Sequence, residues 1–145
     1  MKDALAKVLQ FHETFYCYTQ FTPNGAIPPA EAAIRITLLK EELEEYQAAV
    51  EAGDLVAIAD ALTDLLYVLF GTFIAHGLQD LVDELFEEVH RSNMSKLDER
   101  GQVIAREDGK ILKSKLFSQP DIRAILKRYS EIQENLPPQK PVKID

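Results

Sequence analysis

The fold is decided by LLKEELEEYQAAV (38–50), AGD (52–54) and LVAIADALTDLLYVLF (55–70). Apolar residues recur every three to four positions in the first segment, and the third is apolar on nearly all sides, so both are predicted to be helices. Gly53 is a typical C-terminal stop and Asp54 a typical N-cap. Because the connection is so short, the two helices are predicted to fold back on each other as an antiparallel hairpin.

This hairpin would bring acidic side chains of both helices to the same level. Glu42 lies eleven positions before Gly53 and Asp64 eleven positions after it, so the two are predicted to face each other. Carboxylates held together in a packed interface repel unless protons or a cation intervene, and no lysine or arginine occurs between Glu41 and His90. Oxygen ligands of this kind suit Mg²⁺, or Mn²⁺. We therefore predict a metal site formed by Glu41, Glu42, Glu45, Asp60 and Asp64.

The alternative interpretation of the first helix is a solvated face, which a run such as Glu-Glu-Leu-Glu-Glu (41–45) also fits. The second helix argues for the metal site. Asp60 and Asp64 lie in a segment that is otherwise apolar, and aspartate is both a poor helix former and costly to bury.

The whole sequence predicts an all-α fold, an antiparallel helix bundle with a small β-hairpin appendage. The hairpin signal is Asp108-Gly109, which stands between apolar pairs. With no repeat and no domain boundary in sight, one domain is expected over 1–145, with an irregular proline-rich tail at 136–145. Helices are expected over about 2–19, 30–51, 55–76, 80–97 and 121–134.

Composition narrows the classes of protein. The net charge of −8 argues against a general nucleic-acid binder, which would carry a basic stripe. Cys17 is the single cysteine, so no intrachain disulfide can form. The first residues mix charged and apolar side chains and show no secretory signal, and the longest apolar stretch, 65–75, is shorter than a membrane span. We expect a cytoplasmic protein with no membrane partner.

A second polar cluster lies further along the chain. Asn93 and Lys96 are three positions apart on one helix face, where they can donate to phosphate oxygens. Lys110 and Lys113 add positive charge at the predicted hairpin, although ordinary surface charge explains these residues equally well. The Glu-x-x-His of Glu87-Glu-Val-His90 matches half of a di-iron site, which needs two such motifs.

Together these segments resemble a known family. Glu42-x-x-Glu45, Asp64-Leu-Leu-Tyr-Val, Glu-Val-His-Arg-Ser-Asn-Met-Ser-Lys (88–96) and Arg-Glu-Asp-Gly-Lys (106–110) are similar to segments of the all-α nucleoside triphosphate pyrophosphatases. That superfamily includes MazG, the dimeric dUTPases and phosphoribosyl-ATP pyrophosphohydrolase. The strongest likeness is to the MazG-like, phosphoribosyl-ATP pyrophosphohydrolase-like branch, and it covers roughly 8–125.

The resemblance implies roles for individual residues. Glu42 and Glu45 match the family's first metal-binding pair, Glu41 the extra acid before it, and Asp64 the end of the second pair. One departure is Ala61, where the family has Glu, and Asp60 is the candidate replacement. Glu41 or Glu45 would activate the attacking water. Asn93 and Lys96 match phosphate-contacting positions, with Lys110 and Lys113 as further candidates, while His12, Phe15 and Tyr16 offer stacking surfaces for the base.

The implied reaction is Mg²⁺-dependent hydrolysis of a (deoxy)nucleoside triphosphate to the monophosphate and pyrophosphate, as in nucleotide-pool sanitation. The family also implies a homodimer or homotetramer, consistent with so apolar a helix at 55–76. The alternative is a catalytically impaired helical oligomer, its activity lost with the change to Ala61, that binds nucleotide or a protein partner.

Overall fold

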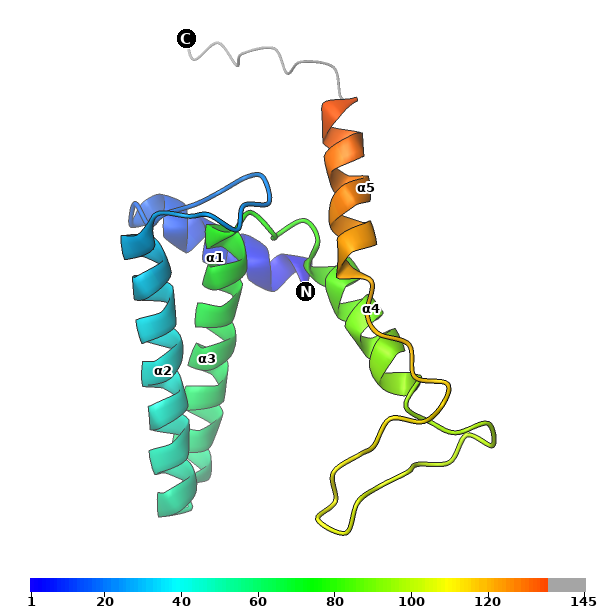
Figure 1. Ribbon diagram of the computed structural model, residues 1–145. Coiled ribbons are helices and arrows are strands. Elements are labelled where there is room, and N and C mark those ends of the chain that lie inside the picture. Colours follow the sequence, from blue (N-terminus) through cyan, green and yellow to red (C-terminus); the bar gives the residue numbers. More distant parts are fainter. Residues whose placement is uncertain (136–145) are drawn as a thin grey trace. The chain divides into compact units, whose positions relative to one another are not determined.

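The computed structural model describes residues 1–135, which form helices and no strand (Figure 1). The all-α prediction is confirmed. The chain divides into two compact units, Met1–Asp83 and Glu84 onwards, each described by itself. The expected single domain stays a prediction, and the expected tail at 136–145 lies outside the described residues. The helices are α1 Lys2–Thr14, α2 Pro29–Ala52, α3 Leu55–Ala75, α4 Val82–Met94 and α5 Ile122–Glu134.

The hairpin of α2 and α3 forms as predicted, with the helices antiparallel and side by side (Figure 1). Gly53 ends α2 in the left-handed conformation, φ 65°, and its N–H donates to the Ala49 and Val50 carbonyls. The Asp54 carboxylate caps α3 by accepting from the N–H groups of Val56 and Ala57, at 2.9 and 3.2 Å. Local signals in the sequence therefore account for both helix ends.

The first helix is shorter than predicted, since α1 ends at Thr14 rather than near residue 19. Tyr16 adopts φ 56°, a left-handed conformation that a helix cannot continue through, and the Cys17 N–H donates back to the His12 carbonyl at 2.8 Å. The chain then runs as a loop along the C-terminal end of α3. Gln20 and Asn24 hold it there, their N–H groups donating to the carbonyls of Ile74 and His76.

The core of the first unit lies between α1 and the C-terminal half of α3. Ile74 is fully buried there and Val8 is 2 % exposed. The opposite half of the hairpin, which carries the acidic residues, has no α1 against it (Figure 1). The core cluster consists of Leu5, Val8, Phe70, Ile74 and Val82.

The predicted β-hairpin is wrong as a pair of strands. The turn is present, with Gly109 at φ 83° and the Arg106 N–H donating to the Lys110 carbonyl at 2.9 Å. Pairing stops at one isolated bridge between Ala105 and Ile111. Residues 101–113 are exposed throughout, and two extended segments without a packed face are marginal as a sheet.

In the second unit, one carboxylate fastens α4 to the start of α5. Glu88 Oε1 accepts from the Asp121 N–H at 2.7 Å, and both Glu88 oxygens accept from the Arg91 guanidinium at 2.7 Å. Arg91 also donates to the Gln119 carbonyl at 3.1 Å. The Asp121 carboxylate in turn caps α5 by accepting from the Ala124 N–H at 3.0 Å.

We expect the hydrogen bonds that Glu88 accepts from Arg91 and Asp121 to be lost on acidification. The bonds from Arg91 and Asp121 lower the pKa of Glu88 from 4.5 to about 2. A depressed carboxylate pKa gives stability that is present above the ordinary value and is lost as the pH falls towards 2. NMR titration should place the Glu88 midpoint near 2, and exchange of the Asp121 amide should accelerate over the same pH range. A midpoint near 4.5, the ordinary value for a glutamate, would contradict these hydrogen bonds.

The helix α3 extends over nearly the predicted range, and with 21 residues it could cross a membrane by length and composition. The core helix of a soluble protein passes the same test. A span would place Asp64 near the centre of the bilayer, where an aspartate costs about 2.5–3.5 kcal/mol. The absence of a membrane partner stays a prediction, supported by this cost.

Candidate functional site

The predicted acidic residues do come together on the α2–α3 hairpin. Glu42 is half-buried between the helices, and the other four are exposed. Its pKa is raised, first by the loss of solvent around it and then by the negative charges of its neighbours. These neighbours lie on both helices: Glu45, Asp64, Glu41 and Asp60, in falling order of effect.

No lysine, arginine or histidine among residues 1–135 forms an ion pair that offsets this charge. Within residues 1–135 none of the five carboxylates takes part in an ion pair. Nor does any group of three or more His, Cys, Asp or Glu side chains in this described part stand ready to hold a metal ion. The five carboxylates thus lie close enough to repel but are not closed around one point. An all-oxygen, anionic donor set of this kind fits a hard divalent cation such as Mg²⁺.

An open hollow of about 340 Å³ lies between the helices at the turn end of the cluster, lined by Glu45 and Asp60 and floored by alanines. Ala61 belongs to this floor and is 3 % exposed. Asp60 therefore lines the same hollow as Ala61, the position where the resemblance expects Glu. That placement favours Asp60 as the substitute ligand.

His12 is a core residue of the first unit, 3 % exposed. Its Nδ1 lies 3.0 Å from the Tyr18 carbonyl oxygen, which can only accept, so Nδ1 carries the proton. Burial lowers the pKa of His12, and the nearby positive charge of Arg35 lowers it further, against the opposing effect of the Tyr18 bond. The imidazole is therefore neutral at pH 7.

Phe15 belongs to an exposed aromatic group at the end of α1. It is 63 % exposed, and its ring centroid lies 4.4 Å from that of Phe11. Phe11 meets Tyr67 of α3 edge-on at 5.8 Å. Tyr67 lies one helical turn after Asp64, which puts the aromatic group next to the carboxylates. Our sequence reasoning missed Phe11 and Tyr67, although the three-residue spacing from Asp64 was a usable signal.

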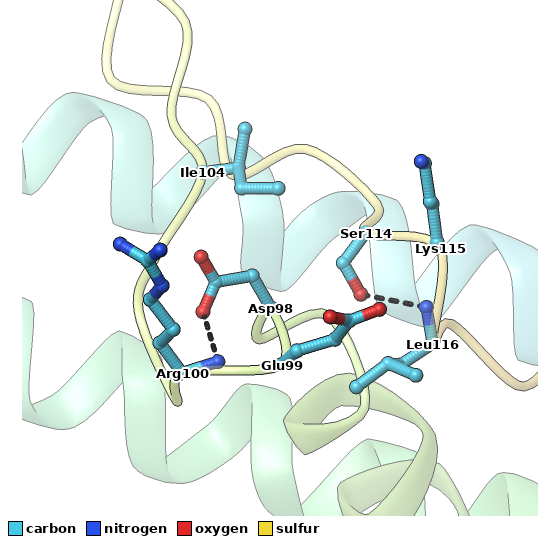
Figure 2. Close-up of a pocket in the computed structure, with 7 residues that line it drawn as sticks. All are labelled: Asp98, Glu99, Arg100, Ile104, Ser114, Lys115 and Leu116. Atoms are coloured by element: carbon cyan, nitrogen blue, oxygen red, sulfur yellow. Dashed lines mark hydrogen bonds between the residues drawn. The ribbon is translucent and has the colours of Figure 1, made fainter.

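The predicted phosphate-binding residues belong to the second unit. Lys96 Nζ donates to Asn93 Oδ1 at 2.7 Å, so these two share a face as expected. Lys113 Nζ lies 4.1 Å from the Phe117 ring centroid, and Lys110 is exposed at the turn. A separate hollow of about 270 Å³ in this unit, between residues 98–104 and 114–116, contains none of the four (Figure 2).

The sequence model of the phosphoribosyl-ATP pyrophosphohydrolase family matches residues 8–93. The chain belongs to this family. The match includes all five carboxylates and Asn93, and it ends before Lys96, Lys110 and Lys113. A search of curated proteins gives no significant match.

The chain is also similar to a solved structure. The chain is 28% identical to a "putative NTP pyrophosphohydrolase" from Exiguobacterium sp. 255-15, with a TM-score of 0.51. The similarity covers 89% of this chain and 97% of the other. The family and this neighbour indicate a hydrolase of the NTP pyrophosphohydrolase type, acting on phosphoric anhydrides.

Proposed function

We propose that the protein is a Mg²⁺-dependent nucleoside triphosphate pyrophosphohydrolase that converts a (d)NTP to the (d)NMP and pyrophosphate, in nucleotide-pool sanitation. The observation that carries the proposal is the meeting of five uncompensated carboxylates on two antiparallel helices, within the segment that matches the family. At neutral pH such a cluster gains stability when a cation binds, and a triphosphate brings Mg²⁺ with it.

The acidic residues divide between holding the cation and handling water. Glu42, Glu45, Asp60 and Asp64, with Glu41, would hold Mg²⁺. When bound, the ion neutralises the charge of the phosphates. Glu41 or Glu45, both exposed, orients the attacking water and accepts its proton. Attack at the α-phosphorus then expels pyrophosphate as the bond to the bridging oxygen breaks.

Other residues would bind the rest of the substrate. The rings of Phe11, Phe15 and Tyr67 offer the base a stacking surface beside the carboxylates, with His12 behind them in the core. Asn93 and Lys96, with Lys110 and Lys113, supply amide and ammonium donors for phosphate oxygens.

The active form would be a cytoplasmic homodimer or homotetramer. The hairpin exposes large apolar side chains on both helices, among them Leu43 at 55 %, Leu62 at 47 % and Leu66 at 48 %. Exposed apolar side chains on both helices of a hairpin would be covered in an interface between copies of the chain. Light scattering after size-exclusion chromatography would test this, and a monomer at micromolar concentration would contradict it.

The direct test of the function is a panel of (d)NTPs with Mg²⁺, in which both phosphorus products are identified. We expect pyrophosphate and the monophosphate from at least one nucleotide, and no turnover with chelator. Release of single phosphate would place the attack at the γ-phosphorus and contradict the proposal.

Ala61 supports a second candidate function, an oligomer that binds nucleotide or a protein partner without hydrolysis, since a family ligand is missing there. Calorimetric titration with each (d)NTP would identify it. Binding without pyrophosphate release under Mg²⁺ or Mn²⁺ would favour this candidate over the enzyme.

A further inference from the structure

Arg35 of α2 extends its guanidinium over the backbone of Gly71 in α3. A Cβ atom placed on Gly71 would lie 2.7 Å from Arg35 Nη1 and 2.9 Å from His12 Nε2. The missing side chain of this buried glycine therefore provides the space that both groups occupy. Both Arg35 and Gly71 lie eighteen positions from Gly53, which places them at one level of the hairpin.

Arg35 is half-buried and lacks a carboxylate partner among residues 1–135. Two exposed arginines of the second unit do have such a partner, Arg91 in Glu88 and Arg128 in Glu84. A guanidinium held partly out of water without an anion is unfavourable, so an anionic ligand would be bound strongly there.

Arg35 and Gly71 lie on the same helix faces as two of the carboxylates. Arg35 lies seven residues before Glu42, and Gly71 lies seven after Asp64, so each pair shares a helix face two turns apart. The separation along the helices is about 10 Å. A phosphate chain together with an extended arginine side chain can bridge such a distance.

His12 does not offer a second positive charge for binding an anion. Its Nδ1–H is engaged by the Tyr18 carbonyl, so Nε2 faces Arg35 and Gly71 as an unprotonated nitrogen. It offers no positive charge and no donor on that side. The positive charge at this level of the hairpin therefore comes from Arg35 and not from His12.

We propose that Arg35 is a substrate-binding residue whose guanidinium donates to phosphate oxygens of the bound nucleotide, while the carboxylate cluster holds the chain through its cation. This inference rests on the proposed function and adds a specific phosphate contact to it. The planar fork of arginine can make two parallel bonds to one phosphate, which an ammonium cannot.

The test measures, by calorimetry, the binding of inorganic tripolyphosphate to the protein in the presence of Mg²⁺. KM for the preferred NTP is measured on the same variants. Arg35→Met should weaken tripolyphosphate binding about 10- to 100-fold, the range of charge-assisted hydrogen bonds, and raise KM in parallel. Arg35→Lys should recover part of the loss. Arg123→Met, which removes the same charge from exposed α5, is the control and should leave binding unchanged.

A second variant avoids the loss of charge. Gly71→Ala should displace the guanidinium and the imidazole and weaken tripolyphosphate binding as well, with circular dichroism to confirm that the helices persist. Unchanged tripolyphosphate affinity in Arg35→Met, or no binding by the wild type, overturns the inference. Loss of NTP affinity alone also overturns it, since Arg35 would then contact the base. Arg35-dependent binding without any turnover would uphold the inference and reject the proposed function.

Discussion

Glu42→Gln is expected to reduce pyrophosphate release by about 10³-fold or more and, at the same time, to stabilise the metal-free protein. Glu42 is the acidic residue whose pKa is raised by all four of the others. If the proposed function holds, removing its charge takes away a ligand of a cation that would supply several kcal/mol of charge stabilisation, and each 1.36 kcal/mol is a tenfold change in rate.

The stability of the same variant changes in the opposite direction. Because the folded state raises the pKa of Glu42 above 4.5, the charged carboxylate destabilises the folded protein at neutral pH, and this cost disappears as the pH falls below the folded pKa. The neutral amide removes the cost at every pH. We expect the melting temperature in chelator to rise by about 2–4 °C, as for a gain near 1 kcal/mol.

Glu44→Gln is the matched control, because Glu44 is exposed on the same helix and does not contribute to the raised pKa of Glu42. It should change neither pyrophosphate release nor the melting temperature. Calorimetry without divalent cations and product analysis with Mg²⁺ give the two readouts. A Glu42→Gln protein that is less stable than the wild type in chelator would show that this carboxylate is not held against its neighbours.

The hairpin and its register were predictable because its signals are local. Gly53 and Asp54 fix the turn, and counting outward from it places Glu42 opposite Asp64. In the structure Asp64 lies close enough to Glu42 to raise the pKa of that carboxyl group, and the closeness of Arg35 to Gly71 extends the same register by two turns. The position of each carboxylate along its helix thus follows from spacing alone.

Other features depend on contacts between distant residues and were missed. The end of α1 at Thr14 follows from the left-handed Tyr16, an aromatic residue that carries no turn signal. The hairpin signal at Asp108-Gly109 was correct for the turn, but within residues 1–135 the two segments are exposed and have no packed layer to hold them together as strands. The role of Gly71 was hidden for the same reason, because only the packed helices show what fills its empty side.

Gly77→Ala is expected to be the most destabilising single substitution at a glycine of this chain. Gly77 follows α3 with φ 69°, and a Cβ there would lie 2.1 Å from the Thr22 carbonyl oxygen and 2.4 Å from its carbon. These are backbone atoms and cannot rotate away. The neighbouring Asn24 is tied to His76 twice, by its N–H to the His76 carbonyl and by its carbonyl to His76 Nδ1, both at 2.9 Å.

Relief of that clash requires the loop to leave α3. We expect Gly77→Ala to lose at least about 4 kcal/mol, most of the stability of an ordinary domain, and to accumulate as insoluble or unfolded protein. Gly53→Ala separates conformational strain from the clash, since Gly53 has nearly the same φ, 65°, with nothing within 4 Å of the added carbon. It should lose only about 1–2 kcal/mol.

Urea denaturation of both alanine variants beside the wild type measures the difference. The two losses share the cost of a left-handed alanine, so their difference reports the packing of the loop against Gly77. Equal losses would mean that residues 22–24 do not lie against α3. A large difference would show that Gly77 allows the loop to pack against the end of α3. The same loop carries the Tyr18 carbonyl that binds His12, and it follows directly on the aromatic group at the end of α1. One position without a side chain would then support both the core and the proposed base-binding surface.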